Sequence, residues 1–126
     1  PDTSPPQLDL NIISISAEST NPSSPNGETE VKFTFRIKDD ISGYKLGYFT
    51  FRDPQGLTKG YYHYPPRRSD LYPNNIDLDW YEYTATVMLP AGSAPGTWGV
   101  TEFTLRDRAL NFKTYDFTET ITFIAE

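Results

Sequence analysis

Four oxygen-bearing side chains in two predicted loops could bind a hard cation: Asp39, Asp40, Asp107 and Asn111. Ca²⁺ takes six to eight oxygen ligands from carboxylates, amides and carbonyls, and these residue types supply the first two kinds. The same residue types also turn the chain by accepting hydrogen bonds from nearby backbone N–H groups. The sequence contains no D-x-[DN]-x-[DN]-G calcium loop. A Ca²⁺ site and a purely structural turn therefore both remain as alternatives.

A run of aromatic residues between residues 61 and 83 could form a binding surface. In an alternating strand, one of Tyr61 and Tyr62 must face outward, and likewise one of Trp80 and Tyr81. Exposed rings can stack on the apolar faces of sugars or anchor a protein partner. The competing interpretation is that the rings pack in the core and cover a long loop. The candidate ligand-binding residues are Tyr62, Tyr64, Tyr72 and Trp80.

Residue types that perform catalysis are sparse in this chain. His63 is the only histidine, whereas a metal site usually needs several imidazoles and a triad needs a nucleophile and an orienting acid. Alternation puts Asp77 and Asp79 on one face of a strand, but glycosidase carboxylates face each other across a cleft. Arg67 and Arg68 form too short a run for a basic patch. We therefore expect that the domain is not an enzyme and requires no cofactor.

Composition excludes several other classes of protein. The chain has 126 residues and a net charge of −6 (11 basic minus 17 acidic residues), so it reads as one domain whose surface repels nucleic acid. It has no cysteine, which excludes disulfides and thiolate sites. No apolar run approaches the ~20 residues that span a bilayer, so we expect no membrane insertion. Residues 1–7 are rich in proline and resemble a linker, which leaves residues 8–126 as the domain.

Short stretches of alternating or β-branched residues predict about seven strands, and no segment shows a helical period. The clearest is EVKFTFRIK, in which Val31, Phe33, Phe35 and Ile37 share one face. In the strand from 97, the apolar phase slips between Val100 and Phe103, and a β-bulge near Thr101 and Glu102 would keep both apolar pairs facing inward. The predicted strands cover residues 8–19, 30–38, 46–53, 57–64, 80–89, 97–106 and 115–125. This pattern predicts an antiparallel immunoglobulin-like β-sandwich of two sheets.

Five short motifs occur in an order that resembles bacterial immunoglobulin-like repeat modules of large secreted and surface proteins: DTSPP, DDISG, FTFRDPQG, YTATVMLP and GTWGVTEFTLRDRALN. Two positions depart from that pattern, because Leu110 stands where the family has glycine and Tyr44 replaces a small apolar residue. A leucine disfavours positive φ, so we expect a turn at Leu110 that differs from the family's. The resemblance implies spacers, adhesin stalks or accessory domains, and no catalytic residues.

The combined interpretation is a non-catalytic structural or adhesive module of a bacterial exported or surface protein. Its expected partners are neighbouring domains of the same chain, and a glycan or a surface protein is a further candidate. In a sandwich of this kind, the loops after the second and sixth strands lie at one end, together with the N-terminal linker. That shared location is what would allow Ca²⁺ to stiffen the junction between modules. The alternative function is a carbohydrate-binding module that uses the aromatic residues between 61 and 83.

Overall fold

The computed structural model describes residues 4–20, 27–38, 43–65, 80–117 and 121–125, and all regular structure within these ranges is β-strand. The alternating sequences account for this, because β-branched and aromatic side chains on one face can be buried while the other face stays in water. The strands are β1 (Gln7–Ser19), β2 (Thr29–Lys38), β3 (Tyr44–Arg52), β4 (Thr58–His63), β5 (Tyr81–Leu89), β6 (Gly96–Asp107), β7 (Phe112–Asp116) and β8 (Thr122–Ala125).

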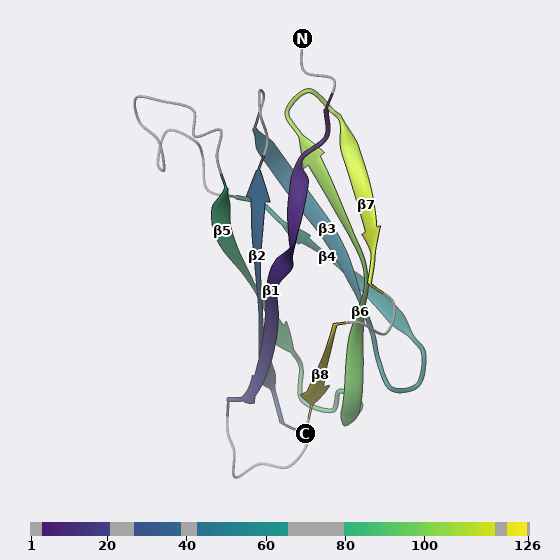
Figure 1. Ribbon diagram of the computed structural model, residues 1–126. Coiled ribbons are helices and arrows are strands. Elements are labelled where there is room, and N and C mark those ends of the chain that lie inside the picture. The colour runs from purple at the N-terminus through teal and green to yellow at the C-terminus, as the bar shows by residue number, and fades with distance from the viewer. Residues whose placement is uncertain (1–3, 21–26, 39–42, 66–79, 118–120, 126) are drawn as a thin grey trace.

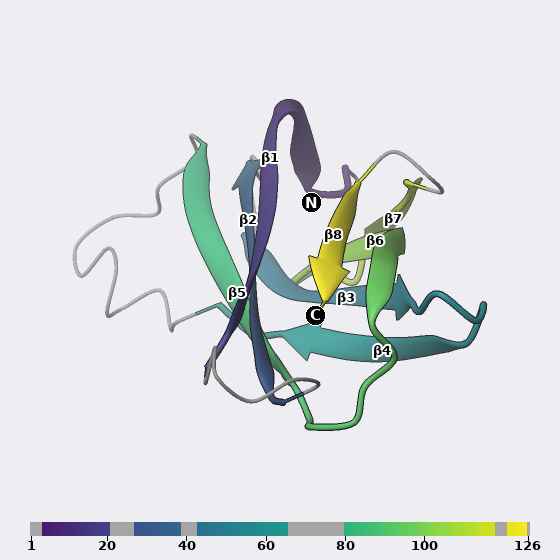
Figure 2. The ribbon, with the colours of Figure 1, turned by 90° about the horizontal axis from the view of Figure 1, so that it is seen from below.

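The strands form two antiparallel sheets that pack face to face (Figures 1 and 2). One sheet has the order β1-β2-β5, and the other has the order β4-β3-β6-β7 with β8 also paired to β6. In immunoglobulin-like terms, β1, β2 and β5 take the places of strands A, B and E, and the second sheet takes those of C′, C, F and G. The prediction of an all-β antiparallel sandwich is confirmed. Within the described residues, no helix is long and apolar enough to cross a membrane.

Six of the predicted strands agree with the observed ones to within two residues at each end. The seventh, predicted over residues 115–125, is instead two strands. β7 begins earlier than predicted, at Phe112, and pairs with the second half of β6, whereas β8 pairs with the first half. The long β6 strand of 12 residues thus has two successive partners on one edge, and the structure has eight strands rather than about seven.

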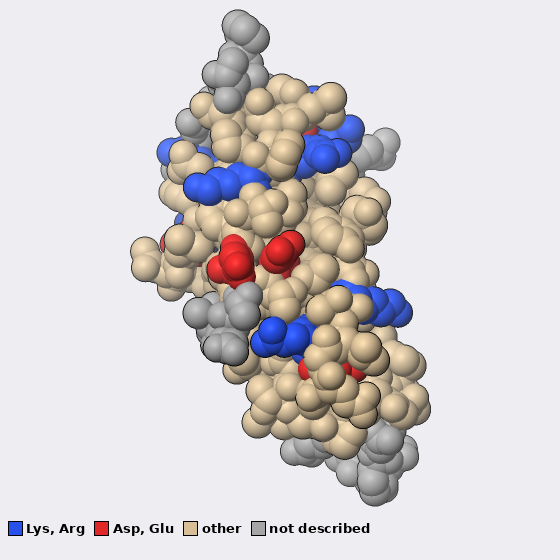
Figure 3. Space-filling model, turned by 90° about the vertical axis from the view of Figure 1, so that its right-hand side faces the viewer, with Lys and Arg blue, Asp and Glu red and all other residues tan. Residues whose placement is uncertain are grey.

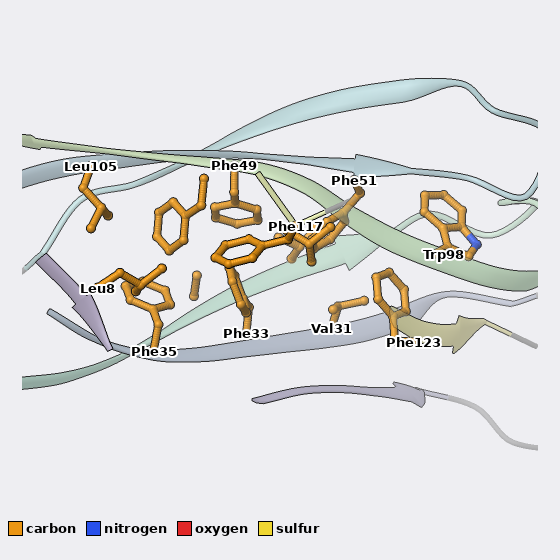
Figure 4. Close-up of a cluster of buried hydrophobic side chains, with 14 of the residues drawn as sticks. Leu8, Val31, Phe33, Phe35, Phe49, Phe51, Trp98, Leu105, Phe117 and Phe123 are labelled. Carbon is orange, nitrogen blue, oxygen red and sulfur yellow. The ribbon is translucent and has the colours of Figure 1, made fainter. Parts of the chain in front are cut away.

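The core is built from the inward faces of both sheets. In β2, the side chains of Val31, Phe33, Phe35 and Ile37 are at most 2% exposed, as their alternation predicted. Phe33 meets rings from the opposite sheet: its centroid lies 5.4 Å from that of Phe49 (Figure 4) and 5.4 Å from that of Phe103. Edge-to-face and tilted pairs of this kind add about 0.5–1.5 kcal/mol each beyond the burial of their area. The predicted burial of Trp98 is confirmed, since it is 8% exposed.

A β-bulge interrupts β6 at Thr101, as the phase slip predicted. Thr50 of β3 pairs with Glu102, whereas the next residue, Phe51, pairs with Val100, so Thr101 is the additional residue. The Thr101 hydroxyl hydrogen-bonds that of Thr50, which gives the bulged residue a polar partner. The bulge lets Val100 and Phe103 both face the core, where each is 0% exposed.

The two ends of the domain lie far apart. β1 begins at one end of the sandwich, beside the β6–β7 turn, and β8 finishes at the opposite end (Figure 1). The β6 strand between these ends has 12 residues, which corresponds to about 40 Å at ~3.3 Å per residue. The chain therefore enters at one end of an elongated body and leaves at the other.

Candidate functional site

The turn between β6 and β7 holds Asp107 and Asn111 in a closed set of hydrogen bonds. The backbone N–H of Asn111 donates to Oδ1 of Asp107 at 2.8 Å, and the Asn111 side-chain amide donates to Oδ2 at 3.0 Å. The Asp107 N–H donates to the Asn111 carbonyl at 3.0 Å. Asp107 is 0% exposed, and a buried carboxylate needs such donors because it has lost water. The turn is thus a structural unit in which both carboxylate oxygens accept hydrogen bonds.

This turn lies against the segment that follows β2. The N–H of Arg108 donates to the Gly43 carbonyl at 3.1 Å, and Tyr44 pairs with Asp107 at the start of the β3–β6 ladder. Asp39 and Asp40 themselves lie outside the described residues. The contact with Gly43 agrees with the prediction that the two loops share one end of the domain.

Of the four predicted metal ligands, the structure describes only Asp107 and Asn111. Among the described residues, no group of three or more histidine, cysteine, aspartate or glutamate side chains could hold a metal ion. Asp107 and Asn111 are together, but to bind an ion Asp107 would have to exchange its hydrogen bonds with Asn111 for the ion. A Ca²⁺ site at this end of the domain stays a prediction.

The expectation for Leu110 was wrong. Leu110 adopts φ = 71°, the left-handed conformation in which the family pattern places glycine. The Leu110 N–H donates to the Asp107 carbonyl at 3.2 Å, so the hydrogen bonds of the turn fix this backbone conformation despite the side chain. An L-residue in this region costs roughly 1–2 kcal/mol. The buried Asp107 carboxylate and its bonds to Asn111 offset that cost.

Replacing Leu110 by glycine should therefore raise the free energy of unfolding by about 0.5–1 kcal/mol, the strain relieved less the extra entropy of an unfolded glycine. The leucine side chain is 64% exposed, so little packing is lost. Urea denaturation measures the change. Leu57→Gly is the matched control, because Leu57 is equally exposed at 67% and has no positive φ. If the Leu110→Gly protein is no more stable than the Leu57→Gly protein, the backbone of Leu110 is not strained in the native protein.

The aromatic candidates separate into two groups. Tyr62 and Tyr64 are 60% and 68% exposed, and their rings stack with centroids 6.0 Å apart and planes 20° apart. Trp80 is half-buried immediately before β5, in the other sheet. Tyr72 lies outside the described residues. The prediction that one of Tyr61 and Tyr62 faces outward is confirmed, since Tyr62 is the exposed one, and the rings of Tyr62 and Tyr64 are in contact with each other.

Residues that the sequence did not single out complete the surface around Tyr62. The Tyr48 ring lies 4.8 Å from that of Tyr62, and the two residues are paired between β3 and β4. A depression of about 250 Å³ is lined by Leu46, Tyr48, Tyr62, Thr104 and Arg106. The alternation of Tyr48 with the buried Phe49 and Phe51 could have indicated its outward direction. The approach of Arg106 depends on the register between β3 and β6.

His63 contributes to the packing between the sheets. Its Nδ1 lies 2.9 Å from the Tyr44 hydroxyl, and its ring meets the edge of Phe35 with centroids 5.2 Å apart. Burial lowers the pKa of His63 to about 4 and raises the pKa of Tyr44 well above its usual value, with a smaller contribution from Tyr83. Both groups are therefore neutral near pH 7. The other residues considered for chemistry lie outside the described ranges: Arg67, Arg68, Asp77 and Asp79.

The protein is an all-β sandwich domain. It has a hydrogen-bonded turn around the buried Asp107 and an exposed group of aromatic rings around Tyr62. More particularly, the chain belongs to the family described as Domain of unknown function (DUF7035), whose model matches residues 2–125. No curated protein matches the chain. The family description names no activity or ligand, so the resemblance to bacterial immunoglobulin-like repeat modules stays a prediction.

Proposed function

We propose that this domain is a non-catalytic structural module that spaces and orients its neighbours in an exported or cell-surface protein. The observation that carries the proposal is the position of the two ends, since β1 begins at one end of the sandwich and β8 finishes at the other (Figure 1). Modules with this geometry join end to end, and each one adds its own length to the assembly.

The packing supports the same role. A domain that sets a distance must resist bending, and the large rings of β2, β3 and β6 interlock across the whole width between the sheets. The single histidine of the chain pairs with Tyr44 and packs against Phe35, which is a structural use. The β6–β7 turn, closed by the hydrogen bonds of Asp107, lies at the end of the body at which β1 begins (Figure 1).

The proposal is tested by measuring the distance between the flanking domains of the parent protein by single-molecule energy transfer. Deleting the domain should shorten that distance by about 40 Å, the length of β6 at ~3.3 Å per residue. An unrelated sandwich with termini at opposite ends should restore the distance. A Gly/Ser linker of equal residue number should give a broad distribution, because such a linker behaves as a flexible coil. An equally broad distribution with the native domain would overturn the proposal.

A further inference from the structure

The outer face of the sheet β4-β3-β6-β7 brings together side chains from strands far apart in sequence. Tyr62 pairs with Tyr48, Tyr48 with Thr104, and Thr104 with Thr114, so one row crosses all four strands. In the adjacent row, Leu46 pairs with Arg106 and Arg106 with Phe112. We call the five residues that line the depression the tyrosine–arginine face: Leu46, Tyr48, Tyr62, Thr104 and Arg106.

The rings of this face are held in place by the sheet beneath them. A Cβ on Gly60 would collide with the Tyr48 ring, so Gly60 leaves the space in which that ring lies across the strand. Tyr62 packs against Tyr48 of the neighbouring strand and stacks on Tyr64, two residues further along the chain. Flat rings that are already ordered lose little conformational entropy when a ligand packs on them. The C–H faces of a sugar ring are suited to such a surface, because aromatic faces carry partial negative charge.

Arg106 supplies a positive charge beside the rings. Its guanidinium lies 5.9 Å from the centroid of the Phe112 ring, which orients it, and it makes no ion pair among the residues that the structure describes. The protein carries a net charge of −6, yet basic side chains lie among the acidic ones on the side seen in Figure 3. A guanidinium matches a carboxylate in charge and in hydrogen-bond geometry. The charge of Arg106 therefore favours an anionic group in the depression.

Hydroxyl groups complete the polar part of the face. The Thr104 and Thr114 hydroxyls lie 2.8 Å apart, and each can donate as well as accept, as sugar hydroxyls require. The depression of about 250 Å³ is smaller than the roughly 300–1,000 Å³ of drug-sized ligand sites. It therefore suits one ring at a time, as when a chain of sugars lies across an open surface.

We propose that the tyrosine–arginine face binds an acidic polysaccharide, with a sugar ring packed on Tyr62 and Tyr48 and a sugar carboxylate paired with Arg106. An extended peptide gains its affinity from main-chain bonds at a free strand edge. Here β3 and β6 are each paired on both sides, so the centre of the face offers side chains and no free backbone groups. That arrangement favours a saccharide over a peptide. The binding site is additional to the spacing role and does not depend on it.

The test is binding of the domain to an array of uronate- and sialate-containing oligosaccharides, followed by titration calorimetry on the strongest binder and on its carboxyl-reduced form. We expect reduction to weaken binding at least about tenfold, the equivalent of losing one interaction of ~1.4 kcal/mol. Tyr62→Ala and Arg106→Gln should each cost a similar factor. Both side chains lie on the surface, and an unchanged melting temperature will show that the variants are folded.

Two control variants make comparable substitutions outside the tyrosine–arginine face. Arg108→Gln removes an exposed charge from the neighbouring turn, and Met88→Ala removes an exposed apolar side chain from the other sheet. Both should bind the oligosaccharide as the native protein does. The proposal fails if no acidic oligosaccharide binds, or if Arg108→Gln weakens binding as much as Arg106→Gln, which would indicate attraction by bulk charge. It also fails if an array of acidic peptides, and not the glycans, binds in a way that depends on Tyr62.

Discussion

Replacing Asp107 by alanine should lower the free energy of unfolding by about 3 kcal/mol, because two donors of Asn111 lose their charged acceptor at once. The carboxylate is 0% exposed and receives the backbone N–H and the side-chain amide of Asn111. Because the acceptor is buried and both bonds are partly buried, water replaces the carboxylate poorly, and the orphaned donors bear a desolvation cost of about 1–3 kcal/mol each. The fold should survive with a lower urea midpoint, measured by tryptophan fluorescence.

Asp53 provides the matched control for this change. Its Oδ1 accepts the N–H groups of Gln55 and Leu57, both at 2.9 Å, so its hydrogen bonding resembles that of Asp107. The turn after β3 is exposed, however, and water replaces the lost acceptor there. Asp53→Ala should cost about 1 kcal/mol, the usual net contribution of an intramolecular hydrogen bond. Equal losses in the two variants would contradict the view that burial makes Asp107 important.

The architecture could be predicted because this protein keeps one face of most strands in the core and the other in water. Alternation in EVKFTFRIK specified both the strand and the buried side, and Val31, Phe33 and Phe35 are all 0% exposed. The phase slip between Val100 and Phe103 predicted a bulge near Thr101 and Glu102, and the structure has it at Thr101. The start of β7 was harder to predict, because no residue of this strand is buried, and its sequence FKTYD therefore lacks the alternation of apolar and polar residues that marks a half-buried strand.

Leu110 shows where residue preferences mislead. The preference of leucine for negative φ is worth roughly 1–2 kcal/mol, which is less than the bonds that close the turn around Asp107. The tertiary context therefore determined the conformation. The pattern of the bacterial immunoglobulin-like modules that the sequence resembles has glycine at this position, and that agrees with the observed φ of 71° better than the preference of leucine does.

The surface around Tyr62 could be predicted only in part, for a different reason. Alternation indicates that one of Tyr61 and Tyr62 points outward, but it does not reveal which one, or which strand lies beside it. Arg106 reaches the same depression because β3 pairs with both β4 and β6 in a particular register. A bulge shifts that register by one residue, and a slip of one residue would turn Arg106 into the core. Side chains 44 positions apart in sequence, such as Tyr62 and Arg106, are brought together by pairing that no local pattern encodes.

The pair of His63 and Tyr44 should make the domain sensitive to acid. Burial lowers the pKa of folded His63 to about 4, against ~6.5 in an unfolded chain. Because the folded pKa is the lower one, the unfolded state binds the proton first as the pH falls. As far as His63 is concerned, the free energy of unfolding is therefore highest above pH ~6.5 and falls progressively down to pH ~4. We expect a loss of about 2 kcal/mol over this range, less than the full shift implies because the ring is only half-buried.

Carboxylates that become protonated over the same range require a variant that isolates the histidine. His63→Gln removes the titration and keeps a side chain that can hydrogen-bond the Tyr44 hydroxyl, which stays protonated because burial raises the pKa of Tyr44. Among the residues that the structure describes, the rings of Phe35 and Tyr83 also face His63, and neither carries charge in acid. Urea denaturation between pH 7 and pH 4.5 should therefore show a smaller loss of stability in His63→Gln than in the native protein. Parallel losses in the two proteins would mean that His63 does not account for the acid sensitivity, since the remaining titrating groups are the same in both.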